Sequence, residues 1–159
     1  MATEQQTTKP GCVFCNVTAE RGFNIVWEDD HYVAFTDRSP AATHHVLLVP
    51  KKHIDNIKSL HQTDVALAER MAEIGHTVLD QLNVPQDLRR MGFVIPPFNS
   101  VNHLHLHILG LPFTSTVKSI MYRVSSGTDG NDKGFSWFGE VNQVIGILKK
   151  GGSVNVFAC

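Results

Sequence analysis

The stretch VNHLHLHILG, residues 101–110, alternates three histidines with aliphatic residues. Side chains on a β-strand point alternately to its two faces. The pattern therefore predicts a strand with His103, His105 and His107 on one face and the aliphatic residues turned toward a core. One imidazole could act as a nucleophile while its neighbours hold negative charge, or the three could bind zinc, copper or iron. The spacing alone leaves both readings open.

Length and composition restrict the rest of the interpretation. The chain has 159 residues, of which 42% are hydrophobic, enough for one domain with a proper core. With 14 basic and 15 acidic residues the net charge is -1. No basic tract indicates binding to long nucleic acids, and no apolar run approaches the roughly 20 residues of a membrane span. Three cysteines favour a reducing compartment, so we expect the cytoplasm or the nucleus.

The remaining patterns predict an α+β fold, with an antiparallel sheet of about five strands, one long helix and a C-terminal helix. Strands are expected in the hairpin 24–37 and in 44–50, 92–97 and 101–110. Apolar residues at spacings of three and four predict the long helix over 63–82, and a C-terminal helix begins near Val141. A short helix is expected within 116–124. Residues 1–11 are expected to form a disordered tail, followed by a single domain over 12–159.

Three segments together resemble one known family. HLHLHIL at 103–109, FTDRSPAATHHVLLVPKKHI at 35–54 and CVFCNV at 12–17 stand in the order found in the histidine triad superfamily of nucleotide hydrolases and transferases. The nearer resemblance is to its Hint branch, the histidine triad nucleotide-binding proteins, and within it to the third animal-type member. The likeness covers residues 12–110, within a domain core of 12–112, whereas 113–159 is a variable segment.

The resemblance implies a role for each matching catalytic residue. His105, the middle histidine of the triad, corresponds to the nucleophile that attacks the α-phosphorus and forms a nucleotidyl-histidine. His107 would contact the phosphoryl oxygens, and His45 would complete the group near the phosphate. Ser100 matches a serine that hydrogen-bonds the phosphate and the leaving group. Fixed donors of this kind can meet the charge of the transition state without a metal ion.

The same resemblance assigns a nucleotide-binding set. Asp37 matches the acid that accepts the ribose hydroxyls. The positions around the base are matched by the hydrophobic residues Val13, Phe14, Val17 and Phe35. Asn99, directly before Ser100, is also assigned to nucleotide binding.

The activity implied is hydrolysis of purine nucleoside phosphoramidates or acyl-adenylates, releasing AMP without a catalytic cofactor. The intact histidines favour an enzyme. The loop VIPPFNS is shorter than its counterpart in the common Hint branch, which favours the alternative of a nucleotide-binding interaction module with weak or vestigial catalysis. A homodimer is expected, with the helix at 63–82 packed across the subunit boundary.

The C-x-x-C pair raises a second possible site. Cys12 and Cys15 could simply be packed thiols, because zinc needs two further ligands. In several relatives a similar pair binds structural zinc together with two histidines, which here would be His53 and His103. The three histidines of the opening stretch would then serve two different sites.

Overall fold

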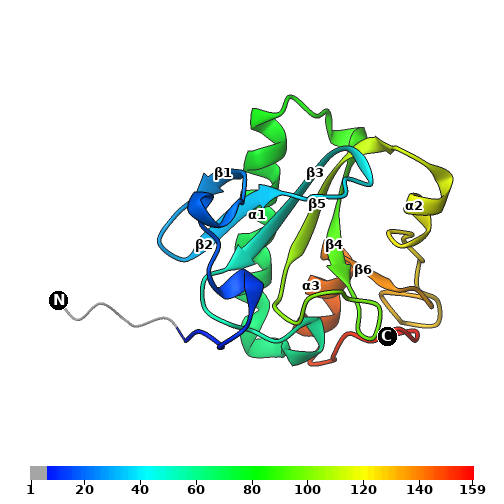
Figure 1. Ribbon diagram of the computed structural model, residues 1–159. Helices are drawn as coiled ribbons and strands as arrows, with labels where there is room; N and C mark the ends of the chain where they lie inside the picture. The colour runs from blue at the N-terminus through cyan, green and yellow to red at the C-terminus, as the bar shows by residue number, and fades with distance from the viewer. Residues whose placement is uncertain (1–6) are drawn as a thin grey trace.

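An antiparallel sheet of six strands forms the centre of the computed structural model, which describes residues 7–159 (Figure 1). The spatial order of the strands is β1-β2-β3-β5-β4-β6. Their bounds are Ile25–Glu28 (β1), Tyr32–Thr36 (β2), Ala42–Pro50 (β3), Arg89–Val94 (β4), Leu106–Phe113 (β5) and Phe138–Glu140 (β6). The predicted α+β class and antiparallel sheet are confirmed, with one strand more than expected.

One face of the sheet is covered by helices α1, Val65–Gln81, and α3, Val141–Lys149 (Figure 1). The third helix, α2 at Thr116–Ile120, follows the end of β5. The strand residues that pack against α1 and α3 in the main core are Ala34, Val46, Leu48, Met91, Leu106 and Ile108. The alternate strand residues are therefore free to build a site on the opposite face.

That opposite face is only partly covered. Leu47 and His107 are paired in register, and His45 lies two residues before Leu47, so these three side chains share the face. A second hydrophobic cluster covers one end of it, where Phe14 from the 3-10 helix Val13–Cys15 packs with Phe35 and Leu47. His105 and His107, next to this cluster, line an open cavity on this face.

The triad segment differs from the uniform strand expected at 101–110. The strand β5 begins only at Leu106, and residues 101–105 bend before it. The backbone N–H of Leu104 donates to the carbonyl oxygen of Ile54 at 2.7 Å, which draws this segment out of the sheet. The expectation of a single strand through all three histidines is therefore wrong, because His103 and His105 precede β5, although Phe14 contacts both of their rings. His103 turns toward the two cysteines of the N-terminal segment, while His107 stays on the sheet.

Strand β6 is the element that the sequence pattern did not indicate. It pairs with β4, and a Cβ atom on Gly92 would lie 2.3 Å from the carbonyl oxygen of Gly139. Only a glycine at position 92 lets the two backbones approach this closely. β6 brings Phe138 into contact with the ring of Tyr122.

The expected tail covers residues 1–11, of which 1–6 lie outside the described residues. The next residues already contact the domain: the backbone N–H of His53 donates to the carbonyl of Thr7 at 2.7 Å, and the N–H of Lys9 donates to Cys15 Sγ. Within residues 7–159, none of the helices has the length and apolar content needed to cross a bilayer.

Candidate active site

A cavity of about 600 Å³ opens on the partly covered face of the sheet. This volume falls within the roughly 300–1,000 Å³ of typical small-molecule sites. His105, His107 and Ser100 line it on one side. The N-terminal segment and the turn after β2 contribute the other lining residues, so the cavity is closed by segments far apart in the sequence.

The orientation of His105 follows from one hydrogen bond. Its Nδ1 lies 2.6 Å from the carbonyl oxygen of His103, and a carbonyl only accepts, so Nδ1 carries the proton. In the neutral ring Nε2 is then left with a free lone pair. Phe14 packs edge-on against the His105 ring, with centroids 5.3 Å apart, and fixes its plane. The cavity thus contains an imidazole held in the tautomer that a nucleophile requires.

A chain of donors orients His107 in the same way. The backbone N–H of Ala41 donates to His45 Nδ1 at 3.0 Å, so His45 carries its proton on Nε2. That Nε2 lies 2.9 Å from His107 Nδ1 and donates to it. His107 therefore holds its own proton on Nε2, the nitrogen not engaged with His45. The pair supplies a proton donor beside the lone pair of His105.

Burial keeps these rings neutral. Burial is the main cause that lowers the pKa of His45, of His105 and, most strongly, of His107. The neighbouring histidines act in the same direction on His45 and His107, because like charges repel. At neutral pH a lone pair on His105 is therefore available without prior deprotonation.

Asp37 lies where the histidines meet the rest of the cavity. Its Oδ1 accepts the backbone N–H of Ser39 at 2.8 Å, and its Oδ2 lies 3.5 Å from His45 Nε2. The carboxylate lines the cavity and is fixed by the turn that follows β2. It can accept hydrogen bonds from ligand hydroxyl groups next to the phosphate position.

The structure brings together most of the predicted nucleotide set. Val13, Phe14 and Phe35 line the cavity, and the Phe14 and Phe35 rings pack edge-to-face at 5.2 Å. Val17 instead packs at the margin of the second hydrophobic cluster, and Asn99 lines a small neighbouring hollow with a volume of about 10 Å³. Neither of these two side chains lines the main cavity.

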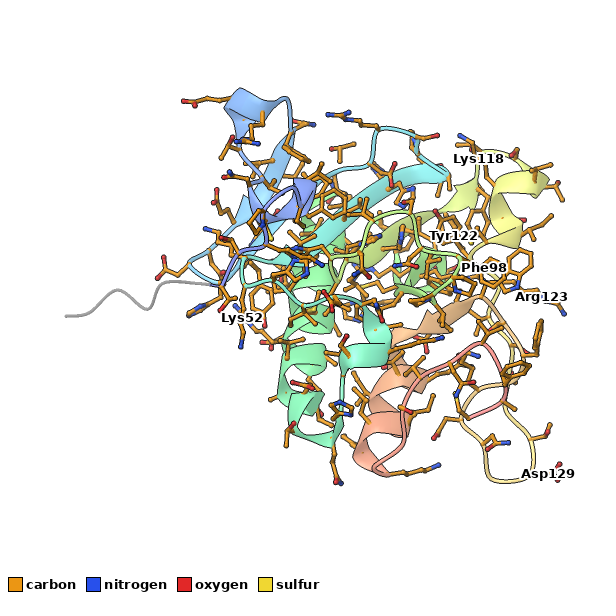
Figure 2. The ribbon with its side chains drawn as sticks, turned by 60° about the horizontal axis from the view of Figure 1, so that its bottom comes forward. Lys52, Phe98, Lys118, Tyr122, Arg123 and Asp129 are labelled. Atoms are coloured by element: carbon orange, nitrogen blue, oxygen red, sulfur yellow. The ribbon has the colours of Figure 1, made fainter. Side chains whose placement is uncertain are left out.

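Tyr122 is the neighbour of the catalytic group that sequence reasoning missed. Its ring centroid lies 5.1 Å from that of His107 and 5.6 Å from that of His45. The Phe138 ring packs edge-on against it with centroids 5.7 Å apart. Tyr122 lies just after α2 in the chain (Figure 2). Burial raises the pKa of Tyr122 to about 12, so its hydroxyl stays protonated. Only long-range packing, which leaves no local pattern, places this ring.

The cysteine and histidine set expected to bind metal does converge. One ligand atom from each of Cys12, Cys15, His53 and His103 lies within 4.8 Å of all the others. Cys12 Sγ is 3.3 Å from His103 Nδ1, and Cys15 Sγ is 3.2 Å from His53 Nδ1. Sulfur and nitrogen ligands of a tetrahedral zinc lie roughly 3.5 Å apart, given bonds of about 2.3 and 2.0–2.1 Å. The four residues fit a closed structural zinc site.

Hydrogen bonds behind the ligands support this fit. His103 Nε2 donates to the carbonyl oxygen of Pro50 at 2.8 Å, and His53 Nε2 donates to Asp55 Oδ1 at 2.8 Å. Both rings therefore present an unprotonated Nδ1 to the thiols, as outer partners do in zinc proteins. Asp37, His45 and His107 also lie within 4.8 Å of one another, but the His45–His107 hydrogen bond already occupies their facing nitrogens.

The comparisons with known proteins agree with this geometry. The family model described as scavenger mRNA decapping enzyme C-term binding matches residues 11–122. Adenosine 5'-monophosphoramidase HINT3 of Xenopus tropicalis is 42% identical over 123 residues, covering 72% of this chain and 78% of the relative. The bifunctional adenosine 5'-phosphosulfate phosphorylase/adenylylsulfatase HINT4 of Arabidopsis thaliana is 38% identical, covering 70% of this chain and 78% of the relative.

Solved structures lead to the same group. A HIT family hydrolase from Clostridium thermocellum has a TM-score of 0.60 and 29% identity, covering 68% of this chain and 96% of its own. A HIT family hydrolase from Legionella pneumophila also reaches 0.60, at 28% identity, covering 67% of this chain and 97% of its own. With the triad motif, the oriented imidazoles and these likenesses, the chain belongs to the histidine triad family, on its Hint branch.

Proposed function

We propose that this chain hydrolyses adenosine 5'-phosphoramidates and related AMP-linked compounds, releasing AMP. The observation that carries the proposal is the unprotonated Nε2 of His105 in the cavity, held by the His103 carbonyl and adjacent to the His45–His107 donor pair. The names of the relatives support an AMP-linked substrate. No metal ion is required by this arrangement.

The first half of the reaction uses His105 as the nucleophile. Its Nε2 lone pair forms a bond to the α-phosphorus while the bond from phosphorus to the leaving group breaks. The ring becomes a nucleotidyl-imidazolium that retains its Nδ1 proton on the His103 carbonyl oxygen. This short hydrogen bond stabilises the positive charge that develops on the ring.

Proton transfer falls to the His45–His107 pair. When the anionic phosphoryl group binds, the pair takes up one proton, because a nearby negative charge favours the protonated form. His107 Nε2 gives that proton to the departing amine, which is a poor leaving group without it. In the second half, water attacks phosphorus and returns a proton to His107, and AMP and the original neutral ring of His105 are regenerated.

The test is turnover of adenosine 5'-phosphoramidate. Replacing the nucleophile in His105→Asn should abolish release of AMP, while AMP binding measured by calorimetry persists. Mass spectrometry without acid quenching should detect AMP on His105 of the active protein. Turnover of His105→Asn within about tenfold of wild type would refute the mechanism, since a missing nucleophile costs far more than this.

We further propose that Cys12, Cys15, His53 and His103 hold one structural zinc ion. A bound zinc would tie the N-terminal segment to the sheet, and the ligand distances and the outer hydrogen bonds support this role. Because the two thiols must stay reduced to act as ligands, a cytoplasmic or nuclear location is part of the proposal. Elemental analysis of protein purified without chelator should give close to one zinc per chain.

The homodimer remains a prediction. The predicted contact is helix α1 across the subunit boundary, while β6 covers the free edge of β4. The outer edge of β1, where Val26 is 39% exposed, is the longer open edge available to a second copy. Light scattering at micromolar concentration tests this, and a monomer would contradict it.

A further inference from the structure

Two arginines line the cavity away from the catalytic histidines, and the proposed reaction does not use them. Arg38 follows Asp37 in the turn after β2, and Arg21 comes from the short helical turn Ala19–Arg21. Together with Asp37 they are the lining residues that carry a full charge at neutral pH, the histidines being held neutral by burial. The cavity therefore carries a net positive charge outside the phosphate position.

Both arginines extend from backbone that is firmly held. Asp37 Oδ1 accepts the N–H of Ser39 and closes the turn around Arg38. The N–H of Arg21 donates to the hydroxyl oxygen of Thr18, and Gly22 ends this short turn in the left-handed region at φ 89°. The two side chains thus start from defined points on the rim of the cavity.

Neither guanidinium is used within the part of the chain that the structure describes. Arg70 and Arg89 make ion pairs with Asp29 and Asp80, whereas no carboxylate among residues 7–159 lies within 4.0 Å of the Arg21 or Arg38 guanidinium. An arginine without a protein partner keeps its planar donors available for a phosphate group.

The position of the pair along the sheet indicates which part of a nucleotide it would meet. His107 and His45 lie on the central strands β5 and β3, Asp37 follows the neighbouring strand β2, and Arg38 comes next in the chain. A nucleotide with its 5'-phosphate at the histidines and its ribose 2'-hydroxyl at Asp37 would bring its ribose 3'-oxygen close to the same turn, which also carries Arg38.

We propose that Arg38, assisted by Arg21, forms a subsite for a phosphate group on the ribose 3'-oxygen. The inference rests on the proposed function, because the orientation of the nucleotide depends on it. The ligand class is a 5'-linked adenylate that carries a second phosphate at the 3' position. That phosphate has two possible sources, a free monoester as in adenosine 3',5'-bisphosphate or the diester that begins an RNA chain as in pApA.

The experiment compares the dissociation constants of AMP, adenosine 3',5'-bisphosphate and pApA by calorimetry. Wild type should bind the bisphosphate about tenfold more tightly than AMP, a factor suited to two partly exposed charge pairs. Tighter binding of pApA as well would assign the subsite to an RNA diester, and a preference for the bisphosphate alone would assign it to a free monoester. The advantage should shrink between about 0.05 and 0.5 M salt, since exposed charges are screened.

Variants separate this subsite from the rest of the site. Arg38→Gln should remove most of the 3'-phosphate advantage while the dissociation constant of AMP changes less than about twofold. The matched control is Arg123→Gln, which removes the same charge from an exposed position near the edge of the molecule in Figure 2. Arg123→Gln should still bind the 3'-phosphorylated ligands more tightly than AMP by the same factor as wild type.

Three results would overturn the subsite. In the first, wild type binds both 3'-phosphorylated ligands no more tightly than AMP. In the second, Arg38→Gln keeps the wild-type preference for a 3'-phosphate over AMP. In the third, Arg38→Gln and Arg123→Gln lose this preference to the same extent. The first would mean that repulsion by the Asp37 carboxylate outweighs the arginines. Failure of the proposed function is distinct, because it would appear as absent AMP binding or absent phosphoramidate turnover in wild type.

Discussion

Removing the metal should make the stability of this protein strongly dependent on pH through His103. The ring is fully buried, and burial lowers its pKa from 6.5 to about 4. In the unfolded chain the same imidazole titrates near its ordinary value. Between these two values the unfolded state binds the proton and the folded state does not. The stabilisation is therefore complete above about pH 6.5 and is lost as the pH falls toward 4.

The magnitude follows from the difference between the pKa of His103 in the folded and in the unfolded chain. A difference of about 2.5 pKa units corresponds to about 3 kcal/mol at most, at about 1.36 kcal/mol per unit. Cys12 and Cys15 next to the ring are only partly buried, so solvent screening reduces the expected loss to about 2 kcal/mol. The other buried histidines act in the same direction, and the wild-type slope contains their contribution as well.

A variant isolates the part due to His103. The free energy of unfolding is measured with urea in the presence of a chelator at pH 7.5 and at pH 4. Its loss between these two pH values should be about 2 kcal/mol smaller in His103→Gln than in wild type. Glutamine can still donate to the Pro50 carbonyl, which preserves that hydrogen bond. His31→Gln, at an exposed position, is the control and should follow the wild-type curve. Identical pH slopes in His103→Gln and wild type would refute the assignment of this loss to His103.

Three further changes test the rest of the site. Cys12→Ser should lower the zinc content and the melting temperature, which elemental analysis and thermal unfolding can check. It should also weaken AMP binding in calorimetry, because the base-lining residues Val13 and Phe14 lie between the two cysteines. Tyr122→Phe should retain near wild-type turnover, whereas Tyr122→Ala should lose at least about tenfold in kcat because it leaves His107 and His45 without their aromatic support. His45→Ala should lower kcat with little effect on AMP affinity, measured in the same assay, because it removes the donor to His107 Nδ1.

Periodicity in the sequence predicted the parts of this fold that depend on local alternation. The aliphatic residues at 106 and 108 do face the core, and the helix expected at 63–82 is found at Val65–Gln81. Periodicity could not predict the bend at 101–105. The bend depends on the hydrogen bond from Leu104 to Ile54, which lies about fifty residues away in the chain. β6 was missed for a similar reason, since a strand of three residues leaves no measurable period.

The functional residues also fall into those that a sequence motif contains and those that only the fold brings to the site. His45, His105 and Asp37 stand within motifs whose spacing is fixed, so the resemblance could place them. Tyr122 reaches the His45 and His107 rings only through packing between distant segments, and the alternation of the sequence did not show that Arg38 lines the cavity. Residues that act through side-chain contacts between distant segments carry no signature in a single sequence.

The bend before β5 explains how one short stretch can serve two sites. Because residues 101–105 leave the sheet, His103 turns toward the thiols while its carbonyl oxygen turns toward the His105 ring. The same residue therefore offers a metal ligand on its side chain and the acceptor that orients the nucleophile on its backbone. Fixing the His103 ring with zinc would also fix that carbonyl, and the tautomer of His105 depends on it. On this view loss of zinc should disturb the ground-state geometry of His105 before it unfolds the domain, and the Nδ1 proton of His105, followed by NMR in metal-free protein, reports on that step directly.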